Sequence, residues 1–244
     1  MNQTIKNKSK DPMGAAIEEY YHTGESARLR VLSSMFDEDE IPVRTLFRSF
    51  EEMPHLEQTA LQMAAGTILD VGAGAGCHSL ALQAMNKDVR ALEISELSVN
   101  VMRERGVEQV LQEDFFSEKL VGPYDTILML MNGSGIIGEM SNMPRFFAQL
   151  DRLLSPKGFV LLDSTDLSYL YEDEEGFIDL TGVDNYYGEV DFQMRYKGLR
   201  SDTFNWLYID FETLNEEAKK YGYVASLIEL GEDGNAFLAK IEKA

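Results

Sequence analysis

A strand that turns directly into a helix through three glycines is the feature that most constrains this chain. The segment TILDVGAGAGCHSLAL (67–82) begins with an apolar run that includes Asp70, and it then places glycine at 72, 74 and 76. Glycine permits a tight bend and lets another molecule approach the backbone closely. A helix beginning at Cys77 would direct its unpaired backbone N–H groups to the same place. The segment therefore predicts a strand–turn–helix unit that can bind a polar ligand at the turn.

From this unit onwards, apolar β-prone runs alternate with stretches of helical period. Strands are predicted at 67–72, 89–94, 108–115, 124–132 and 159–163, and helices at 77–85, 95–105 and 143–154. Such alternation favours parallel strands with helices on both faces. A later helix (211–223) precedes two strands (224–230 and 236–242), whose short GEDGN connection permits only antiparallel pairing. The predicted fold is α/β, with a doubly wound, mostly parallel seven-stranded sheet and an antiparallel last strand.

Two segments stand outside this alternation, and they divide the chain. Residues 11–66 are predicted to be mostly helical and to form an N-terminal helical cap. Residues 166–210, with the acidic run YEDEEGFIDLTGVD and two β-like runs, are predicted to be an α/β or β insertion that covers the substrate. The core domain is then 67–165 with 211–244, and the polar, Lys-rich residues 1–10 are expected to be disordered. Both extra segments should flank the carboxyl ends of the strands, where ligands bind in such sheets.

Charge and cysteine content restrict the partners and the compartment. Lys and Arg number 22 and Asp and Glu number 42, a formal net charge of −20. This surface repels a phosphate backbone, whose binding depends on Lys and Arg, so nucleic acid and anionic membrane are disfavoured as partners. No run reaches the roughly 18 apolar residues of a membrane-spanning helix. The single cysteine, Cys77, is typical of a reducing compartment, and the predicted location is the cytoplasm.

The spacing of the glycines separates two ligand classes. A dinucleotide fingerprint has its third glycine three residues after the second. In this chain Cys77 occupies that position, and the glycine stands one residue earlier, at Gly76. A bulky residue where close helix–strand packing is needed counts against a nicotinamide or flavin cofactor. The spacing therefore favours S-adenosylmethionine, the other ligand class that fits such a turn.

Two further strand ends agree with this interpretation. Glu93 ends the second predicted strand, where a carboxylate can accept hydrogen bonds from both hydroxyls of a ribose. Asp114 ends the third predicted strand and can accept a hydrogen bond from an adenine amino group, while Phe115 can pack against the adenine ring. Three consecutive strands thus deliver glycines, a carboxylate and an Asp–aromatic pair to one rim of the sheet.

With these features in place, the chain resembles the class I S-adenosylmethionine-dependent methyltransferases over roughly 60–165 and 205–244. The resemblance is carried by LDVGAGAG, ALEIS, QEDFF, YDTILMLMN and LLSPKGFVLLD, followed by the closing helix and hairpin, all in the family's order. It implies that the glycine loop faces the methionine moiety, that Asp70 shapes the loop and reaches the amino group, and that Asn132 lies beside the sulfonium. The implied cofactor-binding residues are Asp70, Gly72, Ala73, Gly74, Gly76, Glu93, Ile94, Asp114, Phe115, Met131 and Asn132.

The resemblance also implies methyl transfer by in-line displacement, which needs no metal, because the sulfonium is itself a good leaving group. Catalysis then consists of holding the nucleophile in line and excluding water. Candidate catalytic residues are Asn132 and Tyr21, and no metal ligands are assigned. Asp163 and Asp166 are an alternative metal pair, weighed against two solvated loop acids.

The acceptor is left open. A small molecule is the favoured acceptor, since NGSG stands where methyltransferases of planar nitrogens often carry a Pro-Pro-aromatic motif. The alternatives are a protein or RNA methyltransferase, an NAD-binding oxidoreductase and a catalytically silent cofactor-binding module. Oligomeric state is open too, and so is whether His78, Arg48 or the tyrosines of the insertion contact a ligand.

Overall fold

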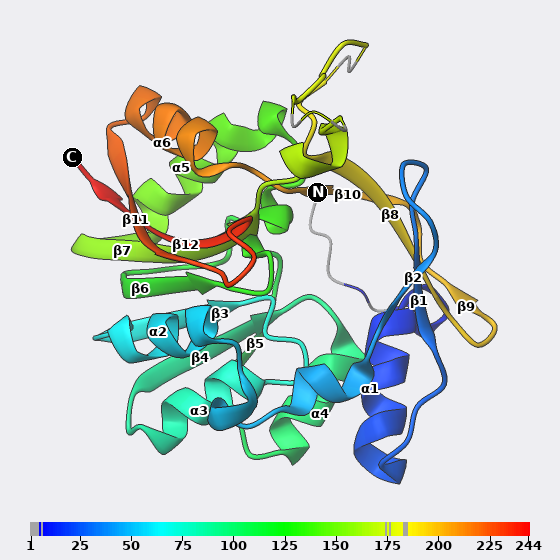
Figure 1. The fold of residues 1–244 in the computed structure, drawn as a ribbon. Coiled ribbons are helices and arrows are strands. Elements are labelled where there is room, and N and C mark those ends of the chain that lie inside the picture. Colours follow the sequence, from blue (N-terminus) through cyan, green and yellow to red (C-terminus); the bar gives the residue numbers. More distant parts are fainter. Residues whose placement is uncertain (1–4, 6, 174, 176, 183–184) are drawn as a thin grey trace.

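The computed structural model describes residues 5, 7–173, 175, 177–182 and 185–244, and within them a seven-stranded sheet forms the centre of the molecule (Figure 1). The strands lie in the order β11 (Tyr223–Leu230), β12 (Ala236–Lys243), β7 (Leu154–Thr165), β6 (Tyr124–Met129), β3 (Thr67–Val71), β4 (Asp88–Glu93) and β5 (Val110–Gln112). The five strands from β7 to β5 pair in parallel, and β12 pairs antiparallel with both of its neighbours. The doubly wound sheet with an antiparallel last strand is therefore confirmed.

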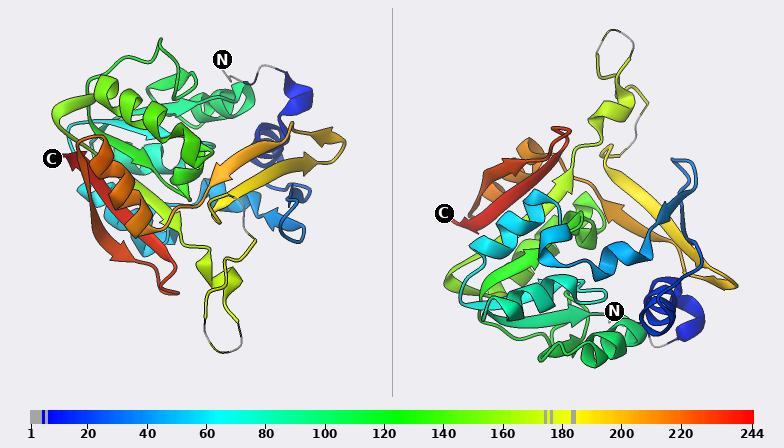
Figure 2. Two further views of the ribbon diagram at one scale, coloured as in Figure 1. Left: turned by 90° about the horizontal axis from the view of Figure 1, so that it is seen from above. Right: turned by 60° about the horizontal axis from the view of Figure 1, so that its bottom comes forward.

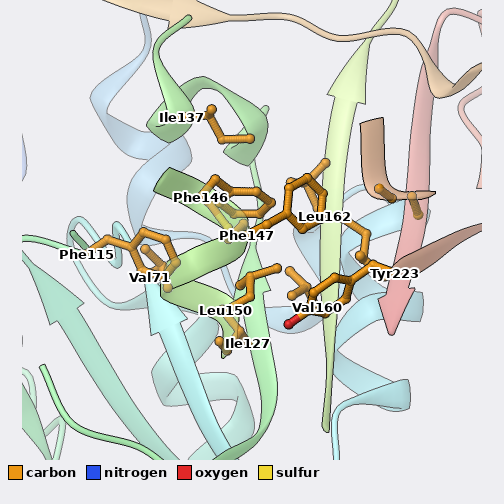
Figure 3. Packing of buried hydrophobic residues seen from close by; sticks show 14 of the residues in the cluster. Val71, Phe115, Ile127, Ile137, Phe146, Phe147, Leu150, Val160, Leu162 and Tyr223 are labelled. Carbon is orange, nitrogen blue, oxygen red and sulfur yellow. The ribbon is translucent and has the colours of Figure 1, made fainter. Parts of the chain in front are cut away.

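Helices cover both faces of this sheet (Figure 1). On one face lie α2 (His55–Met63), α3 (Cys77–Ala84) and α4 (Glu96–Glu104), and on the other α5 (Met143–Leu153) and α6 (Phe211–Lys220). The periodic apolar side chains of α5 explain its position, because Phe146, Phe147 and Leu150 are all fully buried against the sheet. Figure 3 shows these side chains from α5 packed over Val71, Ile127, Val160 and Leu162. The sequence pattern and the packing agree at this helix.

A second, smaller sheet lies beside the first and joins both extra segments of the chain (Figure 1). It has the order β10 (Phe204–Leu207), β8 (Glu189–Tyr196), β1 (Leu29–Leu32), β2 (Asp39–Ile41), with β9 (Leu199–Arg200) paired to β8, and every pairing is antiparallel. Sequence reasoning missed β1 and β2 in a segment expected to be mostly helical. Strands of three or four residues have little local signal, and β1 pairs not only with the nearby β2 but also with β8, far along the chain.

The rest of the N-terminal segment is helical, as expected. It contains α1 (Pro12–Thr23), the 3₁₀ turns η2 (Val43–Phe47) and η3 (Phe50–Glu52), and α2. Of the ten residues expected to be disordered, 1–4 and 6 lie outside the described residues. The others are held in place, because Ile5 exchanges backbone hydrogen bonds with Ile94 and Glu96, and residues Lys8–Lys10 form the 3₁₀ turn η1.

Candidate active site

The glycine loop joins β3 to α3 at the carboxyl edge of the sheet, as predicted. Gly72, Gly74 and Gly76 have φ of +72°, +56° and +83°, the left-handed region that side chains disfavour. At Gly74 an added Cβ would meet only the Gly72 carbonyl oxygen, 4.0 Å away. The backbone of this loop is therefore bare at Gly74, and another molecule can approach it there.

Glu93 holds this loop from the end of β4. Its carboxylate accepts hydrogen bonds from the backbone N–H groups of Gly74 (2.9 Å), Ile94 (2.8 Å) and Ser95 (2.9 Å). Burial, with 9% of the residue exposed, raises the pKa of Glu93 even though these N–H groups favour the charged form. A carboxylate has about four lone-pair sites, so it retains capacity for a further donor.

Asp114 and Phe115 follow β5 on the same rim. Asp114 is buried and its Oδ1 accepts a hydrogen bond from the N–H of Phe116 (2.8 Å). The ring of Phe115 is only 3% exposed and packs against Phe116 and Phe146, with ring centroids 5.1 and 6.2 Å apart. Sequence reasoning expected this ring against an adenine, but here it belongs to the main core, and the neighbouring Phe116 is the partly exposed ring.

Asp70 lies under the glycine loop in a group of buried polar side chains. Its Oδ2 accepts a hydrogen bond from Ser79 Oγ (2.6 Å), and its Oδ1 lies 4.0 Å from Nδ1 of His78. Nε2 of His78 lies 2.6 Å from Glu57 Oε2, and Glu57 in turn pairs with Arg48. His78 and Arg48, whose contact with a ligand the sequence left open, are thus joined through a glutamate, Glu57, that sequence reasoning missed.

The end of β6 is strained. Met131 and Asn132 both have positive φ, +65° and +56°, an arrangement that side chains rarely adopt and that is common at functional sites. The carboxylate of Asp163, at the end of β7, accepts hydrogen bonds from the N–H groups of Met131 (3.1 Å) and Gly133 (2.9 Å) and holds this turn. Thr165 Oγ1 donates to Asn132 Oδ1 (2.7 Å), which fixes the orientation of the Asn132 amide.

The alternative of a metal pair at Asp163 and Asp166 finds no support in this arrangement. Asp163 is engaged by backbone N–H groups, and Asp166 accepts hydrogen bonds from Tyr187 Oη (2.7 Å) and the Ser168 N–H (2.8 Å). Among the described residues, no group of three or more His, Cys, Asp or Glu side chains is arranged to hold a metal ion.

Asp163 makes stability depend on pH. Burial, together with the nearby charge of Glu57, raises the pKa of Asp163 from 3.8 to about 7. Between these values the native carboxyl holds a proton that the unfolded chain has lost, so its contribution to the free energy of unfolding falls as pH rises, by up to about 1.4 kcal/mol per unit. Asp163→Asn cannot ionise. We therefore expect the free energy of unfolding of the variant, minus that of the wild type, to increase from pH 5 to pH 7 when both are measured by urea unfolding. A difference that stays constant with pH would contradict this assignment.

Tyr21 reaches the same region from the N-terminal segment. It packs with Met131 around a buried cluster that joins α1, η2 and the glycine loop and comprises Ile17, Leu46, Ala75 and Val101. Met131 therefore links the two candidate catalytic residues: it packs on the same cluster as Tyr21, and Asn132 follows it in the sequence. This arrangement depends on tertiary contacts that no local sequence signal indicates.

The small sheet closes on the turn that follows Asn132. The indole of Trp206, on β10, lies flat against η4 (Gly133–Ile137), and a Cβ at Gly135 would come within 1.8 Å of Trp206 Cε2. Only glycine permits this close approach. Phe192, Phe204 and Tyr208 continue an aromatic surface from Trp206, with neighbouring ring centroids 6.2 to 6.3 Å apart. All four rings come from the segment predicted to cover the substrate, 166–210.

Other tyrosines of the insertion have structural partners. Tyr186 donates a hydrogen bond to Asp210 (2.6 Å), which also caps the first turn of α6, and Tyr187, which donates to Asp166, has its Oη 3.2 Å from the same Asp210 oxygen. They fasten the base of the insertion to the core domain. Beyond them, η6 (Ser168–Tyr171) and the described residues that follow extend away from both sheets (Figure 2). Residues 174, 176, 183 and 184 of the insertion lie outside the described residues.

The residues on this rim fit a ligand that has a ribose and an amino-acid end. The space over Gly74 is open, and the buried carboxylate of Glu93 adjoins it. In the part of the chain that the structure describes, Nε of Arg48 is a buried donor without a hydrogen-bond partner. An unpaired buried donor next to a loop that admits ligands is the expected condition of a site that pairs with an anionic group on binding.

Comparison with known proteins gives the family context. A family model described as "Methyltransferase domain" matches residues 69–162. A SAM-dependent methyltransferase from Bacteroides fragilis, solved in complex with S-adenosyl-L-homocysteine, is 55% identical over 97% of this chain and 96% of its own, with a TM-score of 0.91. No match was found among the curated proteins.

More distant structures share the fold. The CcbJ methyltransferase from Streptomyces caelestis is 14% identical, covering 80% of this chain and 94% of its own, with a TM-score of 0.55. DesVI from Streptomyces venezuelae is 16% identical, covering 77% and 90%, with a TM-score of 0.53. At these identities the likeness concerns the fold alone.

Proposed function

This chain belongs to the S-adenosylmethionine-dependent methyltransferases, and we propose that it transfers the methyl group to a small-molecule acceptor by in-line displacement. S-adenosylmethionine is the cofactor, since the Bacteroides fragilis relative binds S-adenosyl-L-homocysteine. When bound, it supplies an electrophilic methyl group on a sulfonium, which is itself the leaving group.

The glycine loop and the next two strand ends are assigned to cofactor binding. Gly72, Ala73, Gly74 and Gly76 would receive the methionine moiety, with Asp70 below them. Glu93 and Ile94 would receive the ribose, and Asp114, with the segment that starts at Phe115, the adenine. The observation that supports this assignment is the bare backbone at Gly74 beside the buried Glu93 carboxylate. Met131 and Asn132 would complete the site on the acceptor side.

Asn132 and Tyr21 are assigned to the acceptor side because Tyr21, on α1, packs on the same buried cluster as Met131, the residue before Asn132. Thr165 already donates to the amide oxygen of Asn132, so the amide N–H₂ group is left to donate a hydrogen bond to the molecule that receives the methyl group. The side chain orients the nucleophile, and the small sheet excludes water. Orientation and exclusion of water are sufficient for displacement at a sulfonium.

The charge of the protein and the small sheet support a small acceptor. A net charge of −20 opposes RNA, and the aromatic surface around Trp206 suits an apolar or ring-containing molecule. No helix in the described parts of the chain is long and apolar enough to cross a membrane. A cytoplasmic location remains our proposal, from the single, buried Cys77.

The proposed role of Asn132 gives a kinetic prediction. Asn132→Ala should lower the rate of methyl transfer by about tenfold to a hundredfold, because one orienting hydrogen bond is lost. The dissociation constant for S-adenosylhomocysteine, measured by calorimetry, should change less than about twofold. Asn142→Ala is the matched control, because Asn142 lies beyond the C-terminal end of η4, at the start of α5. An unchanged rate with the natural acceptor would remove Asn132 from the acceptor side.

The proposed function is tested by presenting acceptor classes to the protein with S-adenosylmethionine and measuring formation of S-adenosylhomocysteine. We expect turnover with a low-molecular-weight fraction of cell extract and none with RNA. Turnover confined to the protein fraction would replace the small-molecule proposal by protein methylation. Binding of S-adenosylhomocysteine without turnover in any fraction would favour a silent cofactor-binding module. Binding of NAD(H) alone would favour an oxidoreductase.

A further inference from the structure

A line of buried charged side chains connects the N-terminal segment to the glycine loop. Arg48, directly after η2, places Nη2 2.6 and 2.5 Å from the two carboxylate oxygens of Glu57 on α2. Glu57 Oε2 lies 2.6 Å from Nε2 of His78 on α3, and the other ring nitrogen of His78 faces Asp70 Oδ1 at 4.0 Å. We refer to Arg48, Glu57, His78 and Asp70 as the charged chain. It joins the end of η2 to α2, α3 and β3.

Stability alone does not account for the charged chain. Glu57 and His78 are each only 5% exposed, and the Arg48 side chain is 11% exposed. Removing charges from water costs several kcal/mol per ion, and well-packed apolar side chains would often give equal or greater stability. Since these titratable side chains are buried together beside a loop that admits a ligand, a role in ligand recognition is the better explanation.

The electrostatics of the charged chain are complementary to an amino acid. Burial by itself would lower the pKa of His78, but the bond to Glu57 and the charge of Asp70 outweigh it and raise that pKa. Burial raises the pKa of Asp70, and the charge of His78, 4.0 Å away and too far for a direct hydrogen bond, opposes that rise. A carboxylate at the Asp70 end suits an ammonium group.

The other end of the charged chain suits a carboxylate. Nε of Arg48 is buried and has no hydrogen-bond partner within the described residues. Through Glu57, Arg48 is joined to His78, the second residue of the helix that follows the loop. A carboxylate that arrived there would satisfy the unpaired donor.

We propose that Glu57 and His78 are positioning residues for the amino-acid end of the cofactor, setting Asp70 for its ammonium group and Arg48 for its carboxylate. This inference rests on the proposed function, and it assigns to the N-terminal segment a part in cofactor recognition. The charged chain ends at Asp70 on β3, whereas Glu93 ends β4 and Asp114 follows β5, and these two are assigned to the adenosine. We therefore expect the charged chain to act on the amino-acid end.

Two ligands that differ only at that end test the inference. S-Adenosylhomocysteine has the amino-acid end, whereas 5′-methylthioadenosine has the same adenosine and thioether but ends in a methyl group. In His78→Gln, the amide can still donate to Glu57, but the charge facing Asp70 is lost. We expect the dissociation constant for S-adenosylhomocysteine to rise about tenfold and that for methylthioadenosine less than twofold. Glu57→Gln should give the same selective loss, and it serves as the second variant if His78→Gln does not fold.

His55→Gln is the matched control. His55 also pairs with a glutamate, Glu229 on β11, but its side chain is exposed. It should leave both affinities unchanged. Equal losses for the two ligands in His78→Gln would show a general structural role and overturn the inference, as would no loss for either. Failure of the wild type to bind S-adenosylhomocysteine would instead contradict the proposed function.

Discussion

Replacing Gly74 by valine should abolish binding of S-adenosylhomocysteine while the protein remains folded. Position 74 has φ +56°, and a Cβ there would meet no atom closer than 4.0 Å, so the side chain enters open space. That space is the one assigned to the cofactor. We expect the dissociation constant, measured by calorimetry, to rise by at least about 100-fold, which corresponds to about 2.7 kcal/mol.

The backbone strain introduced by valine must be separated from the loss of ligand space. A non-glycine residue in the left-handed region costs about 1–2 kcal/mol of stability wherever it stands. Gly222→Val is the matched control, because Gly222, after α6, has φ +76° and also faces open space. Both variants should lower the melting temperature similarly, and only Gly74→Val should lose the ligand. Retained affinity in Gly74→Val would show that the cofactor lies elsewhere.

Replacing Glu93 by alanine should weaken binding of S-adenosylhomocysteine by about 1.5–3 kcal/mol, the range for hydrogen bonds to a charged group. Two causes add in this variant. The ribose hydroxyls lose their acceptor, and the N–H of Gly74 loses the carboxylate oxygen that fixes the loop at 2.9 Å. The same change leaves buried N–H groups of Ile94 and Ser95 without a partner, so the melting temperature should fall as well.

Two companion variants distinguish these causes. Glu93→Gln retains an oxygen that can hold the loop but lacks the charge, so we expect an intermediate affinity and a smaller loss of stability. Glu96→Ala removes the same charge three residues further along, in the first turn of α4, and should leave the affinity unchanged. A dissociation constant that is the same in Glu93→Ala and the wild type would refute the ribose assignment.

Several parts of this protein could be predicted from the sequence because their signals are local. The glycine spacing and the helical period of the apolar residues in α5 each depend on residues within a few positions of one another, and the structure has both features. The order of strands then follows from short connections and parallel pairing. The rim that carries Asp70, Glu93 and Asp114 was predictable for the same reason, since parallel strands bring their carboxyl ends to one edge.

Only the tertiary structure decided what surrounds that rim. The pairing of β1 with β8 joins two segments that are separate in sequence, and neither strand has enough local pattern to predict it. Phe115 is a core residue because α5 packs over it, which adjacent residues do not indicate. The charged chain also depends on tertiary contacts. Nothing in the sequence near Arg48, Glu57 or His78 indicates that these residues pair, and they do so only because three elements bury them together. Local sequence signals thus determined the sheet and the cofactor class. The surroundings of the cofactor depend on contacts between segments that are distant in sequence, and the stabilisation that these contacts provide cannot be read from any one segment.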